Sequence, residues 1–234
     1  MAVSGFRTRQ GHVPHDVKFI GDLAGSYLLS SRESYESDQA RVFGCRARSL
    51  TVQMAVLAAP VAGAVGETLA LKLDDIGLIK ASVARITSDG FAADLHVPEK
   101  DIAAMAARID WLKQRRVHAI ADRRLAKRWQ PRNPRSLMIV GDRRDVPCFI
   151  IDLSTSGAAL SADTMPQMGQ PVVVGGVIGR VVRRLEAGFA IQFLTPLAAD
   201  QVETLVAPMP EGKRDALYHA LAMAETSGGE APAA

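Results

Sequence analysis

Residues 148–160 read Cys148-Phe149-Ile150-Ile151-Asp152-Leu153-Ser154-Thr155-Ser156-Gly157-Ala158-Ala159-Leu160. Two apolar runs flank the pattern D-x-S-x-x-G, and short apolar runs bounded by turn residues are typical of β-strands. We expect strands over 146–154 and 157–162, with a tight turn between them. A glycine at position 157 permits either a positive φ in that turn or a close approach of the backbone to a ligand.

A related pattern occurs earlier in the chain, over residues 45–57. Aligned with residues 148–160, this segment has Cys, Leu, Ala and Leu at the same positions, and Gly66 then corresponds to Gly169. After a gap of five residues, residues 81–92 match residues 179–190 at Val, Arg, Gly, Phe and Ala. Unrelated segments rarely share so many positions in one order, so the sequence predicts two copies of one β-domain.

Apolar periodicity extends this pattern to the rest of the chain. We expect strands at 25–29, 42–48, 52–57, 67–73, 78–87 and 91–95 in the first copy, and at 136–141, 146–154, 157–162, 170–174, 177–186 and 188–194 in the second. Helices are expected over 99–118, where Ile102, Met105, Ile109 and Leu112 recur at helical spacing, and over 197–206 and 212–225. The predicted organisation is a flexible N-terminus (1–22), a first β-domain (23–98), a helical linker (99–121), a second β-domain (122–206), and a helix with a disordered tail (207–234).

A basic segment precedes the second copy. It reads Asp122-Arg123-Arg124-Leu125-Ala126-Lys127-Arg128-Trp129-Gln130-Pro131-Arg132, with Arg124 and Arg128 four residues apart and Arg132 in step. Residues 113–135 hold nine Lys or Arg against one acid, a concentration that indicates an anionic partner. Because Pro131 and Pro134 prevent helix from continuing, we expect an extended or disordered segment in the absence of ligand.

The order of these two motifs resembles the PilZ domain, the bacterial receptor module for cyclic di-GMP. The resemblance covers residues 122–194 and, more weakly, about 25–96. It implies a mainly β fold of two small six-stranded barrels joined by an α-helix, with short C-terminal helices. It also implies that Arg124 and Arg128 wrap the ligand against the second barrel, and that the protein regulates a process such as motility or exopolysaccharide production.

The residue types suit a cyclic dinucleotide, which offers phosphates, guanine edges and flat bases. An arginine fork pairs with phosphate or with guanine O6 and N7, and its face stacks on a base. Asp152 can accept from guanine N–H groups, and Ser154 can bond the same edge or a phosphate. The predicted ligand-binding residues are Arg123, Arg124, Arg128, Arg132, Asp152, Ser154 and Gly157, with Arg180 and Arg183 as secondary candidates. The four-residue pair can also be Arg123 with Lys127, or Arg128 with Arg132.

The first copy lacks this motif, which leaves other functions open. Its Ser49, Thr51 and Met54 stand where the second copy has Asp152, Ser154 and Gly157, so the first copy is expected to pack, dimerise or dock a protein partner. Both motifs also have purely structural explanations. A D-x-S-x-x-G pattern often only ends a strand in a turn, and an arginine run is commonly a solvated linker. The alternative function is therefore an interaction module without a ligand. Nucleic-acid binding is disfavoured, since aromatic residues at 5% provide little stacking surface.

Composition and motifs also indicate which classes of protein this chain does not belong to. No apolar stretch approaches the roughly 18–20 residues that span a bilayer, and the first residues lack a signal-peptide pattern, which predicts a cytoplasmic protein. The two cysteines fall at equivalent repeat positions in apolar strands, so both are predicted to be buried thiols. The histidines are scattered, and nucleophile-elbow, Walker and dinucleotide-binding motifs are missing, so neither catalysis, a metal nor a cofactor is predicted.

Overall fold

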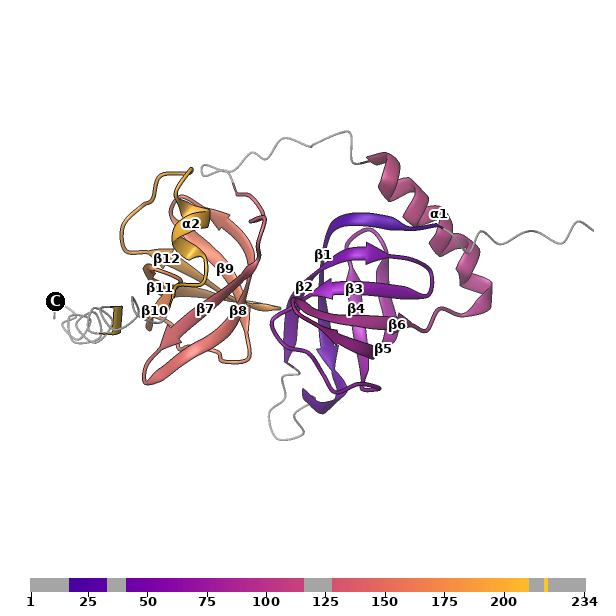
Figure 1. The fold of residues 1–234 in the computed structure, drawn as a ribbon, viewed down its shortest axis with the longest axis horizontal. Coiled ribbons are helices and arrows are strands. Elements are labelled where there is room, and N and C mark those ends of the chain that lie inside the picture. The colour runs from indigo at the N-terminus through magenta and orange to yellow at the C-terminus, as the bar shows by residue number, and fades with distance from the viewer. Residues whose placement is uncertain (1–16, 33–40, 116–127, 211–216, 219–234) are drawn as a thin grey trace, which may run out of the picture.

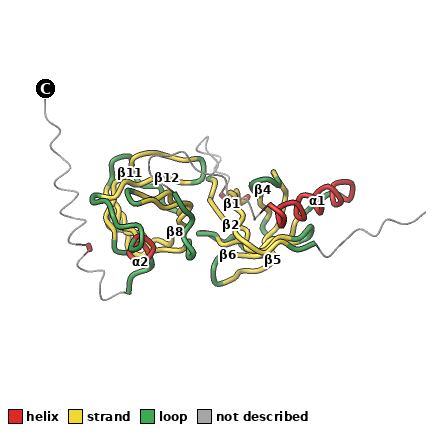
Figure 2. Tube along the Cα trace, turned by 90° about the horizontal axis from the view of Figure 1, so that it is seen from above, coloured by secondary structure: helices red, strands yellow, loops and turns green. Residues whose placement is uncertain are grey.

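The computed structural model describes residues 17–32, 41–115, 128–210 and 217–218. These residues form two six-stranded antiparallel β-barrels in sequence order (Figure 1). The helix α1 (Glu99–Arg115) follows the first barrel and lies on its side remote from the second barrel, as Figures 1 and 2 show. None of the helices in the described ranges is long and apolar enough to cross a membrane.

The two barrels close in the same way. The first has the neighbour order β1-β2-β3-β6-β5-β4 and the second has β7-β8-β9-β12-β11-β10, so each strand of the first has its counterpart in the second. The strands of the first barrel are β1 (Phe19–Leu29), β2 (Val42–Leu50), β3 (Met54–Ala58), β4 (Thr68–Leu73), β5 (Gly77–Thr87) and β6 (Gly90–Leu95). Those of the second are β7 (Arg135–Val140), β8 (Arg143–Ser154), β9 (Gly157–Ala162), β10 (Pro171–Val174), β11 (Val177–Leu185) and β12 (Gly188–Phe193).

Strand irregularities recur at equivalent positions in the two barrels. The pairing of β2 with β3 shifts register between Ala47 and Ser49, and that of β8 with β9 shifts between Ile150 and Asp152. A second pair of shifts occurs at Val83/Arg85 in β5 and at Val181/Arg183 in β11. Bulges of this kind re-aim side chains and are specific features of a fold. The predicted repeat is therefore confirmed down to its local geometry.

Alternating apolar residues build one core inside each barrel. In the first barrel Tyr27 packs against Phe43 and Phe91, with ring centroids 5.5 and 5.2 Å apart. In the second, Phe189 takes the place of Phe91 and is fully buried with Ile150 and Leu160. The predicted apolar face of α1 is confirmed, because Met105, Ala106, Ile109 and Leu112 all belong to the core of the first barrel.

Some predicted boundaries are wrong. The first strand begins at Phe19 rather than at residue 25, so residues 19–22 belong to the barrel and not to a flexible N-terminus. An exposed apolar residue, Ile20, and a register shift between Ile20 and Leu23 obscure the pattern of this stretch, in which Phe19 and Leu23 are both buried.

The C-terminal helices also differ from their predicted ranges. The helix α2 covers only Val202–Val206, shorter than the predicted 197–206, because the Leu197 amide donates to the Thr155 carbonyl (2.8 Å) and residues 199–201 form a turn. The predicted helix at 212–225 lies outside the described residues apart from 217–218, and so do residues 116–118 of the predicted linker helix.

Candidate ligand site at the end of β8

A short chain segment runs beside the end of β8, and we call residues 128–134 the strap. The Trp129 amide donates to the Leu153 carbonyl (3.0 Å), and the Leu153 amide donates to the Trp129 carbonyl (2.8 Å). Farther along, the Ile150 amide donates to the Pro134 carbonyl (2.6 Å). The described part of the predicted basic segment is thus extended and fastened to the barrel, whereas residues 122–127 lie outside the described ranges.

The strap brings Arg128 to Asp152. Arg128 Nη1 lies 3.3 Å from Asp152 Oδ1 and 3.2 Å from Oδ2, so one nitrogen bridges both carboxylate oxygens. The register shift between Ile150 and Asp152 sets the direction in which the Asp152 side chain points from β8. The side chains of Arg128 and Asp152 are 32% and 28% exposed, so both charges stay within reach of a solute.

A cavity of about 190 Å³ opens beside this ion pair. Its walls come from the strap, β8, the β8–β9 turn, β9, β11 and β12. The lining residues are Arg128, Asp152, Ser154, Ser156, Gly157, Ala158, Val182, Arg183, Ala190, Ile191 and Gln192. Arg128, Asp152, Ser154 and Gly157, predicted from two separate motifs, therefore share one cavity with the secondary candidate Arg183.

Ser154 has a structural role in its turn. Its Oγ donates to the Gly157 carbonyl (3.2 Å) and accepts from the Ser156 amide (3.4 Å). Thr51, its counterpart in the first barrel, makes the same kind of contacts with Met54 and Gln53. Because the turn forms in both barrels, the hydroxyl at this position serves the fold even where the rest of the motif is missing.

Gly157 is required by the neighbouring strand. It is not among the glycines with positive φ, which excludes one of the two explanations predicted for it. A Cβ at this position would lie 2.3 Å from the Ile191 carbonyl oxygen of β12. The absence of a side chain thus lets β9 approach β12 closely at the floor of the cavity.

The other predicted arginines have different placements. Arg180 Nη1 donates to the Gly169 carbonyl (2.8 Å), and Arg180 is not among the residues that line the cavity. Around the bulge in β11, Val182, Arg183 and Arg184 are exposed in succession, and Arg183 lines the cavity. The side chain of Arg132 is exposed, whereas Arg123 and Arg124 lie outside the described residues.

Two residues that anchor the strap were not predicted. Glu203 of α2 accepts from the Trp129 indole N–H through Oε1 (3.1 Å) and from the Arg132 amide through Oε2 (3.2 Å). The only sequence signal for Trp129 is its position as an aromatic residue inside a basic run. No sequence signal points to Glu203, since it lies 74 residues from Trp129.

A known protein family matches this part of the chain. The model of the PilZ domain family matches residues 122–207. These residues are a PilZ domain. The family predicted from the two motifs is thereby confirmed for the second barrel, and a PilZ domain is a receptor module rather than an enzyme. Among the described residues, no group of three or more His, Cys, Asp or Glu is placed to hold a metal ion.

Two solved structures are similar to this chain at low identity. The Bacillus subtilis inhibitor of motility (MotI/DgrA) is 9% identical, with a TM-score of 0.26, over 80% of this chain and 94% of that one. Escherichia coli YcgR, solved in complex with c-di-GMP, is 10% identical, with a TM-score of 0.24, over 88% of this chain and 86% of that one. No curated protein matches.

Proposed function

We propose that this chain is a cytoplasmic bacterial receptor for cyclic di-GMP, which binds at the cavity beside the Arg128–Asp152 ion pair. The observation that carries the proposal is the shared wall formed by Arg128, Asp152 and Arg183. These charged side chains come from the strap, β8 and β11, three segments that are far apart in the sequence. Two guanidinium groups beside one carboxylate suit a ligand with phosphates and guanine edges.

Ligand binding would exchange partners at the ion pair. Asp152 would accept from the guanine N1–H and N2–H groups in place of Arg128. The released guanidinium would then pair with a phosphate or stack on the base. In the ligand-free protein the ion pair compensates both charges, which limits the cost of holding a carboxylate ready for guanine.

The size of the cavity limits how much of the ligand it can enclose. Sites that enclose a ligand commonly have volumes of about 300–1,000 Å³, and this cavity has about 190 Å³. We infer that it receives one guanine and that the rest of the ligand lies at the surface. Four residues of chain span at most about 14 Å, so Arg124 can contact a ligand that is held by Arg128.

Calorimetry of the full chain with cyclic di-GMP tests the proposal, with GTP and cyclic di-AMP as controls. Arg128→Ala and Arg124→Ala are each expected to weaken binding by more than about tenfold, because each removes charge-assisted hydrogen bonds and stacking. Wild-type affinity in both variants would refute the assignment. Lys127→Ala and Arg132→Ala test the two other four-residue pairs.

Arg183 has a matched control within the same chain. Its counterpart Arg85 follows the equivalent bulge in the first barrel, where Ser49 and Met54 replace Asp152 and Gly157. We expect Arg183→Ala to weaken binding and Arg85→Ala to leave it unchanged. Equal losses in the two variants would indicate a general effect of net charge.

A second candidate function is an interaction module that acts through a protein partner without a ligand. The observation that favours it is the use of Ser154 within its own turn, as with Thr51 in the first barrel. Under this alternative, cyclic di-GMP would produce neither heat in calorimetry nor a shift in Tm.

A further inference from the structure

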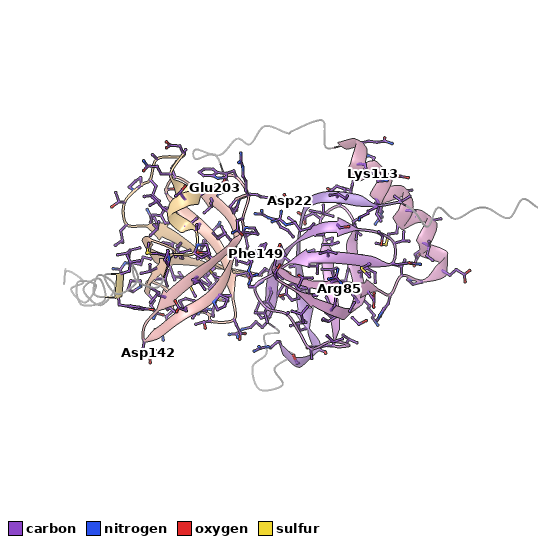
Figure 3. The ribbon with its side chains drawn as sticks, in the orientation of Figure 1. Asp22, Arg85, Lys113, Asp142, Phe149 and Glu203 are labelled. Atoms are coloured by element: carbon purple, nitrogen blue, oxygen red, sulfur yellow. The ribbon has the colours of Figure 1, made fainter. Side chains whose placement is uncertain are left out.

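Arg46 of the first barrel is buried where the first barrel contacts the second. It points outward from β2, yet its residual exposure is only 1%. Its guanidinium carbon lies 5.8 Å from the ring centroid of Phe149 in β8. Figure 3 shows Phe149 at the junction of the two barrels. An arginine from the barrel without the motif therefore reaches the strand that leads to Asp152.

The guanidinium group of Arg46 joins two segments of the candidate site. Nη1 donates to the Pro131 carbonyl of the strap (2.8 Å). Nη2 donates to the Ile151 carbonyl (2.9 Å) and more weakly to the Ile150 carbonyl (3.4 Å) of β8. Pro131 follows Arg128 by three residues, and Ile151 immediately precedes Asp152. One side chain thus holds both backbone segments that present the ion pair to the cavity.

Packing between the barrels does not by itself require an arginine at position 46. The equivalent residue of the second barrel is Phe149, which covers its share of the interface with an apolar ring. Burial lowers the pKa of Arg46 to about 10, and the nearby carboxylates of Asp22, Asp152 and Glu203 oppose this effect. Arg46 therefore stays charged at neutral pH, and a buried charge is tolerated only where its hydrogen-bond donors are satisfied.

Several other contacts between the barrels lie away from the segments that carry the ion pair. The Gly44 amide donates to Ser161 Oγ (3.0 Å), and both Arg32 and Arg41 pair with Asp163 (3.2 and 3.0 Å). By contrast, Arg48 of β2 donates to the Arg132 carbonyl (3.3 Å) and so adds a second contact to the strap. The interface therefore has two parts: Gly44, Ser161 and the Asp163 ion pairs join the barrels directly, whereas Arg46 and Arg48 bind the strap.

We propose that Arg46 is a positioning residue for the ligand site: it fastens the strap and the end of β8 so that Arg128 and Asp152 face one cavity before the ligand arrives. The first barrel, which lacks the motif, thereby contributes to the affinity of the second. This inference rests on the proposed binding of cyclic di-GMP.

Arg46→Met in the full chain is the central variant, because it keeps an apolar chain of similar length and removes the donors. Ser161→Ala is the matched control, since it removes a buried hydrogen bond of the same interface away from the strap. Calorimetry should show cyclic di-GMP binding about tenfold weaker in Arg46→Met, and within about twofold of wild type in Ser161→Ala. Hydrogen exchange without ligand should be faster at the Trp129 and Leu153 amides in Arg46→Met alone.

The outcomes separate the two proposals. If the wild-type chain binds cyclic di-GMP and Arg46→Met binds equally well, with unchanged exchange at the strap, the positioning role is wrong and the receptor function stands. If the wild-type chain does not bind, the receptor function fails and this inference fails with it. Should Arg46→Met not fold, Arg46→Lys decides, because lysine keeps the charge but lacks the fork that reaches both segments. Wild-type affinity and exchange in Arg46→Lys would overturn the positioning role.

Discussion

Gly157 packs against the backbone of β12, where a Cβ would lie 2.3 Å from the Ile191 carbonyl oxygen. We expect Gly157→Ala to destabilise the second barrel by about 1–3 kcal/mol, because β9 and β12 must separate to make room for the methyl group. Thermal unfolding of the full chain measures this loss.

Met54 provides the control for Gly157, because it takes the same position in the first barrel and is 38% exposed. Met54→Ala should change the stability by no more than about 0.5 kcal/mol. Unchanged stability in Gly157→Ala would show that the glycine serves only the approach of a ligand.

Asp152 offers a way to separate binding from stability. Its ion pair with Arg128 is about one-third exposed, and pairs near the surface contribute about 0.2–1 kcal/mol. Asp152→Asn should therefore leave Tm almost unchanged. Binding of cyclic di-GMP should weaken by more than about tenfold, because the amide group places a donor against the guanine N–H groups. A large fall in Tm would mean that Asp152 mainly supports the fold.

At the scale of elements, the strap is held from two sides. Arg46 of β2 bonds its Pro131 carbonyl, and Glu203 of α2 bonds the Trp129 indole and the Arg132 amide. The short helix α2 therefore contributes to the site through a single carboxylate.

The contact between Glu203 and Trp129 can be followed by fluorescence. The chain has two tryptophans, so Trp111→Phe leaves Trp129 as the sole reporter. Adding Glu203→Ala should shift the Trp129 emission to longer wavelength and increase its quenching by acrylamide, because the indole N–H loses its hydrogen-bond partner and becomes more accessible to water. Identical spectra with and without Glu203 would contradict the role assigned to α2.

At the scale of the whole molecule, each barrel contains one buried cysteine, Cys45 in the first and Cys148 in the second. Burial raises the pKa of the Cys148 thiol to about 12, against the effect of a hydrogen bond with Ser136, and burial also raises the pKa of Cys45. An unfolded thiol has a pKa of about 8.5. The stability that this difference contributes is complete below about pH 8.5 and is lost as the pH rises toward about 12.

These thiols report the unfolding of each barrel separately. At pH 8 we expect almost no reaction of the native protein with a thiol reagent, because thiolate is the reactive form and both sulfur atoms are buried. Labelling should begin only as denaturant unfolds each barrel, and Cys45→Ala or Cys148→Ala leaves one reporter at a time. Rapid labelling of either single-cysteine protein under native conditions would contradict the burial of that thiol.

Local patterns in the sequence determined much of the fold. Two copies of a β-domain, most strands, the apolar face of α1 and the PilZ motifs were all predictable, because alternation, helical spacing and turn chemistry involve residues close together in the chain. The start of β1 was missed because an exposed apolar residue, Ile20, and a register shift obscure its pattern. The extent of α2 was missed because the preceding segment bonds to the distant turn at Thr155.

Only the tertiary structure decided how the candidate site is assembled. The sequence left overlapping arginine pairs open, and the strap placed Arg128 beside Asp152, 24 residues away. Likewise, only the structure showed that Arg183 lines the cavity whereas Arg180 donates to the Gly169 carbonyl. Glu203 and Arg46 gave no local signal, since they reach the strap from 74 and 85 residues away. Such contacts depend on closure of the barrel and on docking of one barrel against the other, and no periodicity along the chain encodes either.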